Sequence, residues 1–453
     1  MLLGEVFDRF AAESPVSVMA RAAFEHALPA EAVDALVVEH ADRQYTRELL
    51  FSRLVDLMGL VVCRVQPSLN AAIRKRAADL GVTRRAVYAE LARTEPGLGA
   101  ALVRHTAARL APVVAALGTD REDAVPGSRV RVIDGSHLPG TEHRPRPLRR
   151  TRAGALRGQA VVLFDPATGL ALDAIPCEDG HARERSLAPA ILGWAEPATV
   201  WVGDRNFCTT RLPAGTADRG GCFAVRRHGL TLTELGAGPR VACGRAATGA
   251  VFEEAVRIAD GAGGALAVRR VTVALDTPTR DGDREIRILT NLPAAVSAAR
   301  VAELYRGRWA VEAAFGELAA ALHGEVAGLG YPRAALFAFA VAPCSYNVPA
   351  VIKASIRAAR ATTAPGVSGY HVANEVAGAS RGLLIALPAA EWAVFARVSA
   401  GGLAKVLAAL AGQVRVAEFV ASPRGPKKPR PRRESATGTG HVATARLLKV
   451  PKS

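Results

Sequence analysis

Residues 128–135 read SRVRVIDG and have the pattern of a β-strand. Apolar and polar side chains alternate along it as in a half-buried strand, which is expected to end at Asp134-Gly135. A second apolar run, residues 198–202, reads ATVWV and ends in the same way at Gly203-Asp204. The sequence therefore predicts two strands that each present a carboxylate at the carboxyl end.

The segment between these two strands predicts a hairpin and a helix. Residues 159–164 and 170–175 are apolar runs joined by Asp-Pro-Ala-Thr-Gly, a strong turn sequence. Helical spacing then covers residues 183–194. The order strand, hairpin, helix, strand predicts a mixed α/β sheet with the two carboxylates at the ends of its first and fourth strands.

A third acid lies on a helix much later in the chain. Residues 305–315 read YRGRWAVEAAF, in which Tyr305, Arg308 and Glu312 are three and four residues apart and share one helix face. Arg308 can hold a DNA phosphate with its planar fork, Tyr305 can donate a hydrogen bond to one, and Glu312 can complete a metal site. Trp309 can stack on an extruded base, although a helical Trp is more often part of the core.

The region before the first strand predicts an all-α N-terminal domain. Apolar residues recur at helical spacing over residues 5–117, and residues 77–87 have the spacing of a helix-turn-helix. Thr83 would cap the second helix, whose surface would carry Arg84 and Arg85 toward DNA phosphates. An ordinary helical hairpin with solvated arginines explains the same pattern equally well.

The second half of the chain changes character three times. Alternating stretches rich in Gly, Val, Thr and Arg occupy residues 222–289, and helical spacing resumes near residue 294. Residues 424–433 place six Lys and Arg among prolines and a glycine, which indicates an extended basic tail. The expected parts are a helical DNA-binding domain (1–125), the first part of a catalytic core (126–221), a β-rich insertion (222–290), the second part of the core with C-terminal helices (291–413), and a flexible basic tail (414–453).

The composition favours a nucleic-acid partner. The chain has 58 Lys and Arg against 42 Asp and Glu, a net charge of +16, which suits a polyanion. Its six cysteines form no Cys-x-x-Cys pair, so neither a zinc finger nor a disulfide framework is expected. The longest apolar stretch, residues 334–342, stops at Pro343 and is too short to span a bilayer, and the N-terminus does not read as a signal peptide. We therefore expect no membrane role and a cytoplasmic location.

Taken singly, each acid has an ordinary explanation as a turn or a surface ion pair. Together they give a pattern that resembles the bacterial insertion-sequence transposases of the DDE type, in the insertion sequence four group marked by a Tyr-x-x-Arg-x-x-x-Glu-x-x-x-x-x-x-Lys signature. Residues 132–136 (VIDGS) match the first block of that family, residues 202–207 (VGDRNF) resemble the second, and Tyr305, Arg308 and Glu312 match the third.

This resemblance implies an RNase H-like mixed sheet flanked by helices and a β-rich insertion between the second Asp and the Glu. It implies that Asp134, Asp204 and Glu312 are the catalytic residues and bind two Mg²⁺ ions, which Mn²⁺ can replace. The implied activity is cleavage at transposon ends and strand transfer into target DNA, in a bacterial, nucleoid-associated setting.

The implied partners are double-stranded DNA, as terminal inverted repeats and as target, and a second copy of the chain on paired ends. The expected DNA contacts are Tyr305, Arg308, Trp309, Arg205, Arg84 and Arg85. One position departs from the family pattern, because Ala319 stands where the signature has Lys. The loss of that phosphate contact is expected to weaken the binding of DNA ends more than metal chemistry.

Two alternatives keep the same fold. The first is a catalytically impaired relative that binds DNA as a repressor or domesticated factor, which Ala319 favours and the intact set of three acids opposes. The second is an RNase H-like nuclease that cuts DNA without strand transfer. Joining of a pre-cut DNA end would separate a transposase from both.

Overall fold

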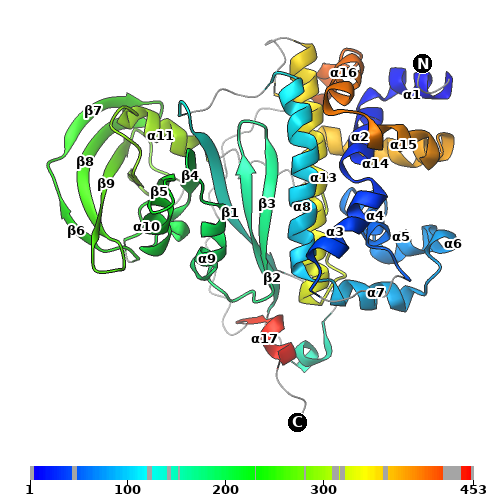
Figure 1. Cartoon of the computed structure of the whole chain (residues 1–453), viewed down its shortest axis with the longest axis horizontal. Helices are drawn as coiled ribbons and strands as arrows, with labels where there is room; N and C mark the ends of the chain where they lie inside the picture. Colours follow the sequence, from blue (N-terminus) through cyan, green and yellow to red (C-terminus); the bar gives the residue numbers. More distant parts are fainter. Residues whose placement is uncertain are drawn as a thin grey trace.

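The structure is a computed structural model of the chain. It describes residues 5–42, 48–119, 125–139, 144–150, 154–229, 231–279, 282–308, 316, 322–360, 366–421 and 440–449. Figure 1 shows a large twisted sheet, two long helices packed beside its central strands, and further helices on the far side of those two.

The central strands form a mixed sheet. They lie in the order β3-β2-β1-β4-β5, with β4 parallel to both β1 and β5, and β2 antiparallel to β1 and β3. Every residue of β4 is buried, as expected for a parallel strand covered on both faces. The mixed sheet flanked by helices confirms the predicted fold class. The strand bounds are β1 (Arg129–Pro139), β2 (Gly154–Asp165), β3 (Leu170–Cys177), β4 (Thr199–Gly203) and β5 (Cys222–Arg226).

The hairpin and the helical segment are confirmed. The turn between β2 and β3 is closed by a hydrogen bond from Gly169 N to Asp165 O of 2.8 Å, and Gly169 has the positive φ of 77° that such a turn requires. Residues 184–194 form the consecutive short helices η2 (Glu184–Leu187), α9 (Ala188–Ile191) and η3 (Leu192–Trp194).

The prediction that the first strand ends at Asp134 is wrong. β1 continues to Pro139 because β2 goes on pairing with it, so that Asp134 lies opposite Val162. Only the parallel neighbour β4 stops, at Gly203. Asp134 therefore lies inside its own strand, at the level where the neighbouring strand ends.

The β-rich region continues the same sheet. β10 pairs antiparallel with β5 and is followed across the sheet by β9 and β8, with β6 and β7 both on β8. These strands form the curved part of the sheet in Figure 1. The predicted start at residue 222 falls on the first residue of β5, which is hydrogen-bonded to β4, and the domain limits stay a prediction. The bounds are β6 (Glu234–Ala237), β7 (Val241–Ala246), β8 (Gly249–Ala259), β9 (Ala265–Leu275) and β10 (Glu285–Thr290).

Two long helices, α8 (Pro96–Ala116) and α13 (Pro332–Ala359), lie side by side against β2 and β3. Asn347 of α13 holds the hairpin, because its side chain accepts from Ala171 N at 2.8 Å and donates to Ala171 O at 2.9 Å. The expectation that the apolar stretch stops at Pro343 is wrong. The 28-residue helix continues through Pro343 and Pro349, and it is long and apolar enough to cross a membrane. Its most apolar window is 100% buried inside the protein, as in the core helix of a folded domain.

The N-terminal region is helical throughout its described residues, as predicted. Gly81, with φ 65°, turns the chain between α6 and α7, and Thr83 caps α7 by accepting from Ala86 N at 3.2 Å. The predicted helix after Thr83 is confirmed. The bounds are α1 (Glu5–Glu13), α2 (Pro15–Ala27), α3 (Ala30–His40), α4 (Phe51–Val62), α5 (Leu69–Lys75), α6 (Ala77–Leu80) and α7 (Arg84–Arg93).

The C-terminal part is more ordered than the expected flexible tail over residues 414–453. Helices α14 (Gly369–Ala386), α15 (Ala389–Arg397) and α16 (Ala400–Ala411) are followed by η5 (Val416–Phe419). Further on, β11 (His441–Ala443) pairs parallel with β2, and α17 (Thr444–Lys449) follows it. The basic run at residues 424–433 lies outside the described residues.

Candidate active site

The two predicted aspartates lie side by side at the carboxyl end of parallel strands. Ile133 is paired with Gly203, so Asp134 and Asp204 are each the next residue along neighbouring strands. Gly203 is in turn paired with Val225, which places Arg226 next to Asp204. Side chains at matched positions of parallel strands point to the same face. We call Asp134, Asp204 and Arg226 the catalytic row, a name taken from the role expected for the two aspartates.

Local sequence fixes the conformation of Asp204. Its carboxylate accepts a hydrogen bond from Asn206 N at 2.7 Å and caps the short helix η4 (Arg205–Phe207). Gly203 lets this turn pack tightly, because a Cβ there would lie 3.2 Å from Phe207 and 3.3 Å from Ile133. The sequence VGDRNF thus forms a strand end followed by a capped turn that holds the carboxylate in place.

A further carboxylate, Glu184, approaches the two aspartates. A Cβ on Gly135 would collide with the Glu184 side chain, so glycine after Asp134 makes room for it. Burial raises the pKa of Glu184 to about 7, and the charges of Asp204 and Asp134 add to this effect, while a hydrogen bond with Asn206 opposes it. Its Oε2 atom is buried without a hydrogen-bond partner among the described residues.

The sequence analysis missed Glu184. It lies in residues 183–194, where the sequence predicts only a connecting helix, and nothing in the spacing of this segment sets Glu184 apart. A carboxylate between two strand-end aspartates could have been suspected only from the three-dimensional path of the connection.

The signature helix also reaches the catalytic row. Tyr305 lies in α11 (Ala298–Gly307) and is 5% exposed, and Arg308 follows the helix and is 9% exposed, with its Cζ 5.8 Å from the centre of the Tyr305 ring. Burial raises the pKa of Tyr305, and so does the charge of Asp204, whereas Arg308 and Arg226 lower it. These opposing effects place Tyr305 within electrostatic reach of both Asp204 and Arg226.

Three predicted positions of this helix, Trp309, Glu312 and Ala319, lie outside the described residues. Within the described ranges, no group of three or more His, Cys, Asp or Glu side chains is arranged to hold a metal ion.

The remaining predicted DNA contacts fall into two places. Arg205 is exposed and directly follows Asp204. Arg84 and Arg85 are exposed at the start of α7, which packs against α13 among the N-terminal helices (Figure 1). The structure brings Arg205 to the catalytic row, whereas the two α7 arginines belong to the helical side of the protein.

None of the curated proteins compared with the chain matches it. Residues 125–347 match the family model described as "Transposase DDE domain". This range begins just before β1 and ends within α13, so it contains both strand-end aspartates, Glu184 and the signature helix. Over these residues the chain is therefore similar to transposase DDE domains.

Proposed function

We propose that the chain is a transposase of the insertion sequence four type that cuts DNA at the ends of its element and joins the cut ends to target DNA. The observation that carries this proposal is the register of β1, β4 and β5, which puts Asp134 and Asp204 side by side at the carboxyl ends of their paired segments. Two carboxylates held together in this way suit divalent-metal chemistry on a phosphodiester.

In this proposal Asp134 and Asp204 hold Mg²⁺, or Mn²⁺ in its place, and Glu312 completes the site. The donors fit such an ion, because carboxylate oxygens are the ligands that Mg²⁺ prefers. Burial is the main cause of the raised pKa of Glu184, and the negative charges of Asp204 and Asp134 add to it. A cation bound here would relieve the part that is due to these charges. When bound, two such ions stabilise the charge on the entering and leaving oxygens of an in-line displacement.

Arg308 and Tyr305 are proposed to position the phosphate at the cut. The guanidinium fork of Arg308 matches two phosphate oxygens, and the buried Tyr305 ring beside it restricts where that fork can lie. Trp309 would stack on a base at the DNA end. Arg84 and Arg85 would contact the backbone of the bound DNA from the helical side of the protein.

Both proposed reactions are phosphoryl transfers. In cutting, a water oxygen bonds to phosphorus, the bond to the 3′ oxygen breaks, and that oxygen leaves as a hydroxyl. In joining, the freed 3′-hydroxyl attacks a target phosphodiester and displaces the 3′ oxygen of the target strand. Two copies of the chain would act on paired terminal inverted repeats.

Ala319 favours a second candidate, a DNA-binding relative with impaired catalysis, because the signature's Lys would supply a phosphate contact there. The experiment that separates the candidates uses the full chain, Mg²⁺, a DNA end already cut to expose its 3′-hydroxyl, and a target plasmid. A transposase yields joined products. A nuclease yields only fragments, and a DNA-binding relative binds the end and changes neither DNA.

A further inference from the structure

A cavity of about 550 Å³ lies beside the catalytic row. Two carboxylates, Asp283 and Glu285, line it. Five arginines also line it: Arg205, Arg226, Arg227, Arg284 and Arg287. Its volume is that of an ordinary ligand pocket, but such pockets are mostly apolar. A cavity walled by guanidinium groups instead suits an anion.

The cavity begins at the catalytic row. Arg226 is the third member of that row, and Arg205 follows Asp204 in the chain. From there the lining passes the carboxyl end of β5 and reaches Arg284 and Arg287 at the start of β10, the strand paired with β5. A chain of phosphates that leaves the catalytic aspartates in this direction would meet one arginine after another.

Internal ion pairs do not neutralise the cavity. Arg226 pairs with Asp283 at 2.7 Å, and Arg287 pairs with Glu285 at 3.0 Å. Arg205 and Arg284 are exposed and form no salt bridge within the described part of the chain. These two guanidinium groups therefore keep their forks available to a ligand.

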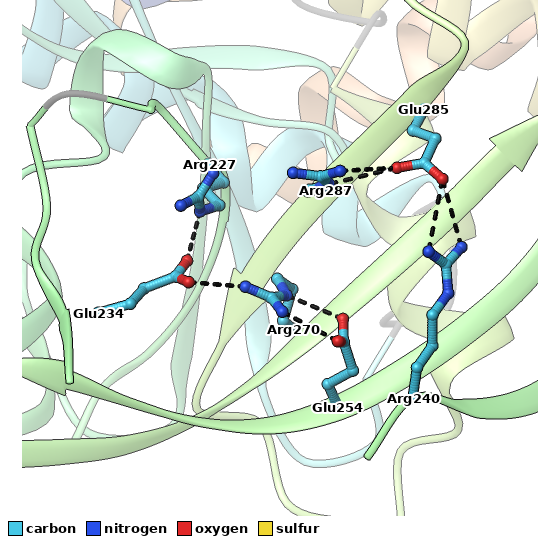
Figure 2. A network of polar contacts seen from close by, with 7 residues as sticks. All are labelled: Arg227, Glu234, Arg240, Glu254, Arg270, Glu285 and Arg287. Atoms are coloured by element: carbon cyan, nitrogen blue, oxygen red, sulfur yellow. Dashed lines mark hydrogen bonds and ion pairs between the residues drawn. The ribbon is translucent and has the colours of Figure 1, made fainter. Parts of the chain in front are cut away.

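Strands β6 to β10 extend the sheet beyond β5, and we call them the extension strands. An arginine–glutamate network on them holds other side chains of this region in place (Figure 2). Arg270 of β9 bonds to Glu254 of β8 through two contacts of 2.9 Å and to Glu234 at 2.7 Å, and Glu234 also accepts from Arg227. Glu285 accepts from both Arg287 and Arg240. Arg227 and Arg287 belong to the network and also line the cavity, so this part of its wall is held in place by hydrogen bonds within the protein.

We propose that this cavity binds the sugar-phosphate backbone of a DNA strand that continues past the cut site. Arginine forks match phosphate oxygens in pairs, and a backbone can use arginines from η4, β5 and β10 together, whereas a free phosphate can use only one or two. The proposal rests on the proposed function only in placing the cut at Asp204. Binding of a polyanion by the cavity does not depend on cutting.

The test measures binding of the full chain to a fluorescent duplex in EDTA over a series of salt concentrations. The substitutions Arg205→Ala and Arg284→Ala are made together. Arg9→Ala and Arg397→Ala serve as the matched control, because they remove two exposed arginines from α1 and α15 at the other end of the molecule. Thermal melting confirms that both variants fold.

Each lost phosphate contact lowers the slope of log K against log salt by about one. We expect the cavity variant to lose about two units of slope and to bind roughly tenfold to a hundredfold more weakly near 0.1 M salt, while the control stays near the wild type. Inorganic phosphate should compete poorly with the duplex. Equal slopes for the cavity variant and the wild type, or an equal loss in the control, would overturn the proposal. Because EDTA prevents metal-dependent cutting, the result stands whether or not the wild type proves to be a transposase.

Discussion

The catalytic row and the arginine–glutamate network differ in whether their charged side chains have partners of opposite charge. Along the row, Asp134 and Asp204 sit next to each other, and Glu184 approaches both with its pKa raised to about 7. On the extension strands, the Arg270 side chain is 14% exposed and lies between two carboxylates. Like charges are thus gathered in one region and opposite charges are paired in the other.

The paired network is expected to stabilise the fold, whereas the cluster of carboxylates is expected to serve the proposed function. A paired network of half-buried ions holds strands together, because each charge has a partner in good geometry. A cluster of carboxylates costs stability in the absence of a cation, since repulsion and burial both oppose ionisation. Carboxylates with pKa values shifted in this way are found most often at functional sites.

The largest effect on stability is expected from breaking the network. Arg270→Leu would leave Glu234 and Glu254 facing each other with little solvent, which should cost roughly 2–4 kcal/mol of unfolding free energy at pH 7. The hydrogen bonds from Arg270 hold the pKa of Glu254 below its usual value of 4.5. The stability that this pair gives the wild type is therefore fully present above about pH 4.5 and is lost as the pH falls below that value, so the difference between the two proteins should shrink in acid.

Urea unfolding of wild type, Arg270→Leu and Arg270→Lys measures this cost. Lysine keeps the charge but not the paired contacts and should lie between the other two. An Arg270→Leu protein as stable as the wild type would show that the network contributes nothing to the fold.

A substitution at Glu184 is expected to raise the stability of the protein and not to lower it. The folded pKa of Glu184, about 7, lies above its usual 4.5. The folded state therefore binds a proton more tightly than the unfolded state, and stability is lost as pH rises from about 4.5 through 7. Glu184→Gln removes that penalty and should stabilise the metal-free protein at pH 8 by roughly 1 kcal/mol, after allowance for partial exposure.

Thermal melting in EDTA at pH 5 and pH 8 measures the Glu184 effect. The melting temperature of the variant should exceed that of wild type by a few degrees at pH 8 and by little at pH 5. A variant that is less stable than wild type at pH 8 would contradict the view that negative charge is crowded at this site.

The smallest effect on stability is expected at an exposed ion pair, which serves as a comparison for the half-buried network around Arg270. Arg245 and Asp276 form an ion pair at 2.7 Å on the same extension strands, but their side chains are 63% and 55% exposed. Arg245→Ala should change the unfolding free energy by less than about 0.5 kcal/mol. A loss as large as that of Arg270→Leu would mean that pairing, not burial, decides the stability of these strands.

Much of the fold could be predicted from local pattern. The hairpin, the end of β4 just before Asp204, and the β-rich character of residues 222–290 all follow from alternation and turn residues. The extra length of β1 could not be predicted, because it depends on continued pairing with β2 after β4 has ended. The local sequence pattern predicts that a strand forms, but it does not predict which strands pair with it or how far that pairing extends.

Tertiary contacts explain the other differences. Pro343 predicts a helix end, yet α13 continues because burial against α8 and the sheet outweighs the lost backbone hydrogen bond. β11 forms in a region expected to be a tail because β2 offers it an unpaired edge. Glu184 and Arg226 join the site through sheet register, which the sequence does not reveal.

The most direct test of the central claim is Mg²⁺-dependent cutting of DNA that carries the repeats flanking the gene. Wild type is compared with Asp134→Ala, Asp204→Ala and Glu312→Ala, and with Asp218→Ala, which alters an exposed carboxylate after α10 (Arg211–Ala217). We predict that wild type and Asp218→Ala cut at the repeat ends, while the other three still bind DNA and cut at least about a thousandfold more slowly. Cutting by Asp134→Ala or Asp204→Ala at the wild-type rate would contradict the assignment of these aspartates as the metal-binding catalytic pair.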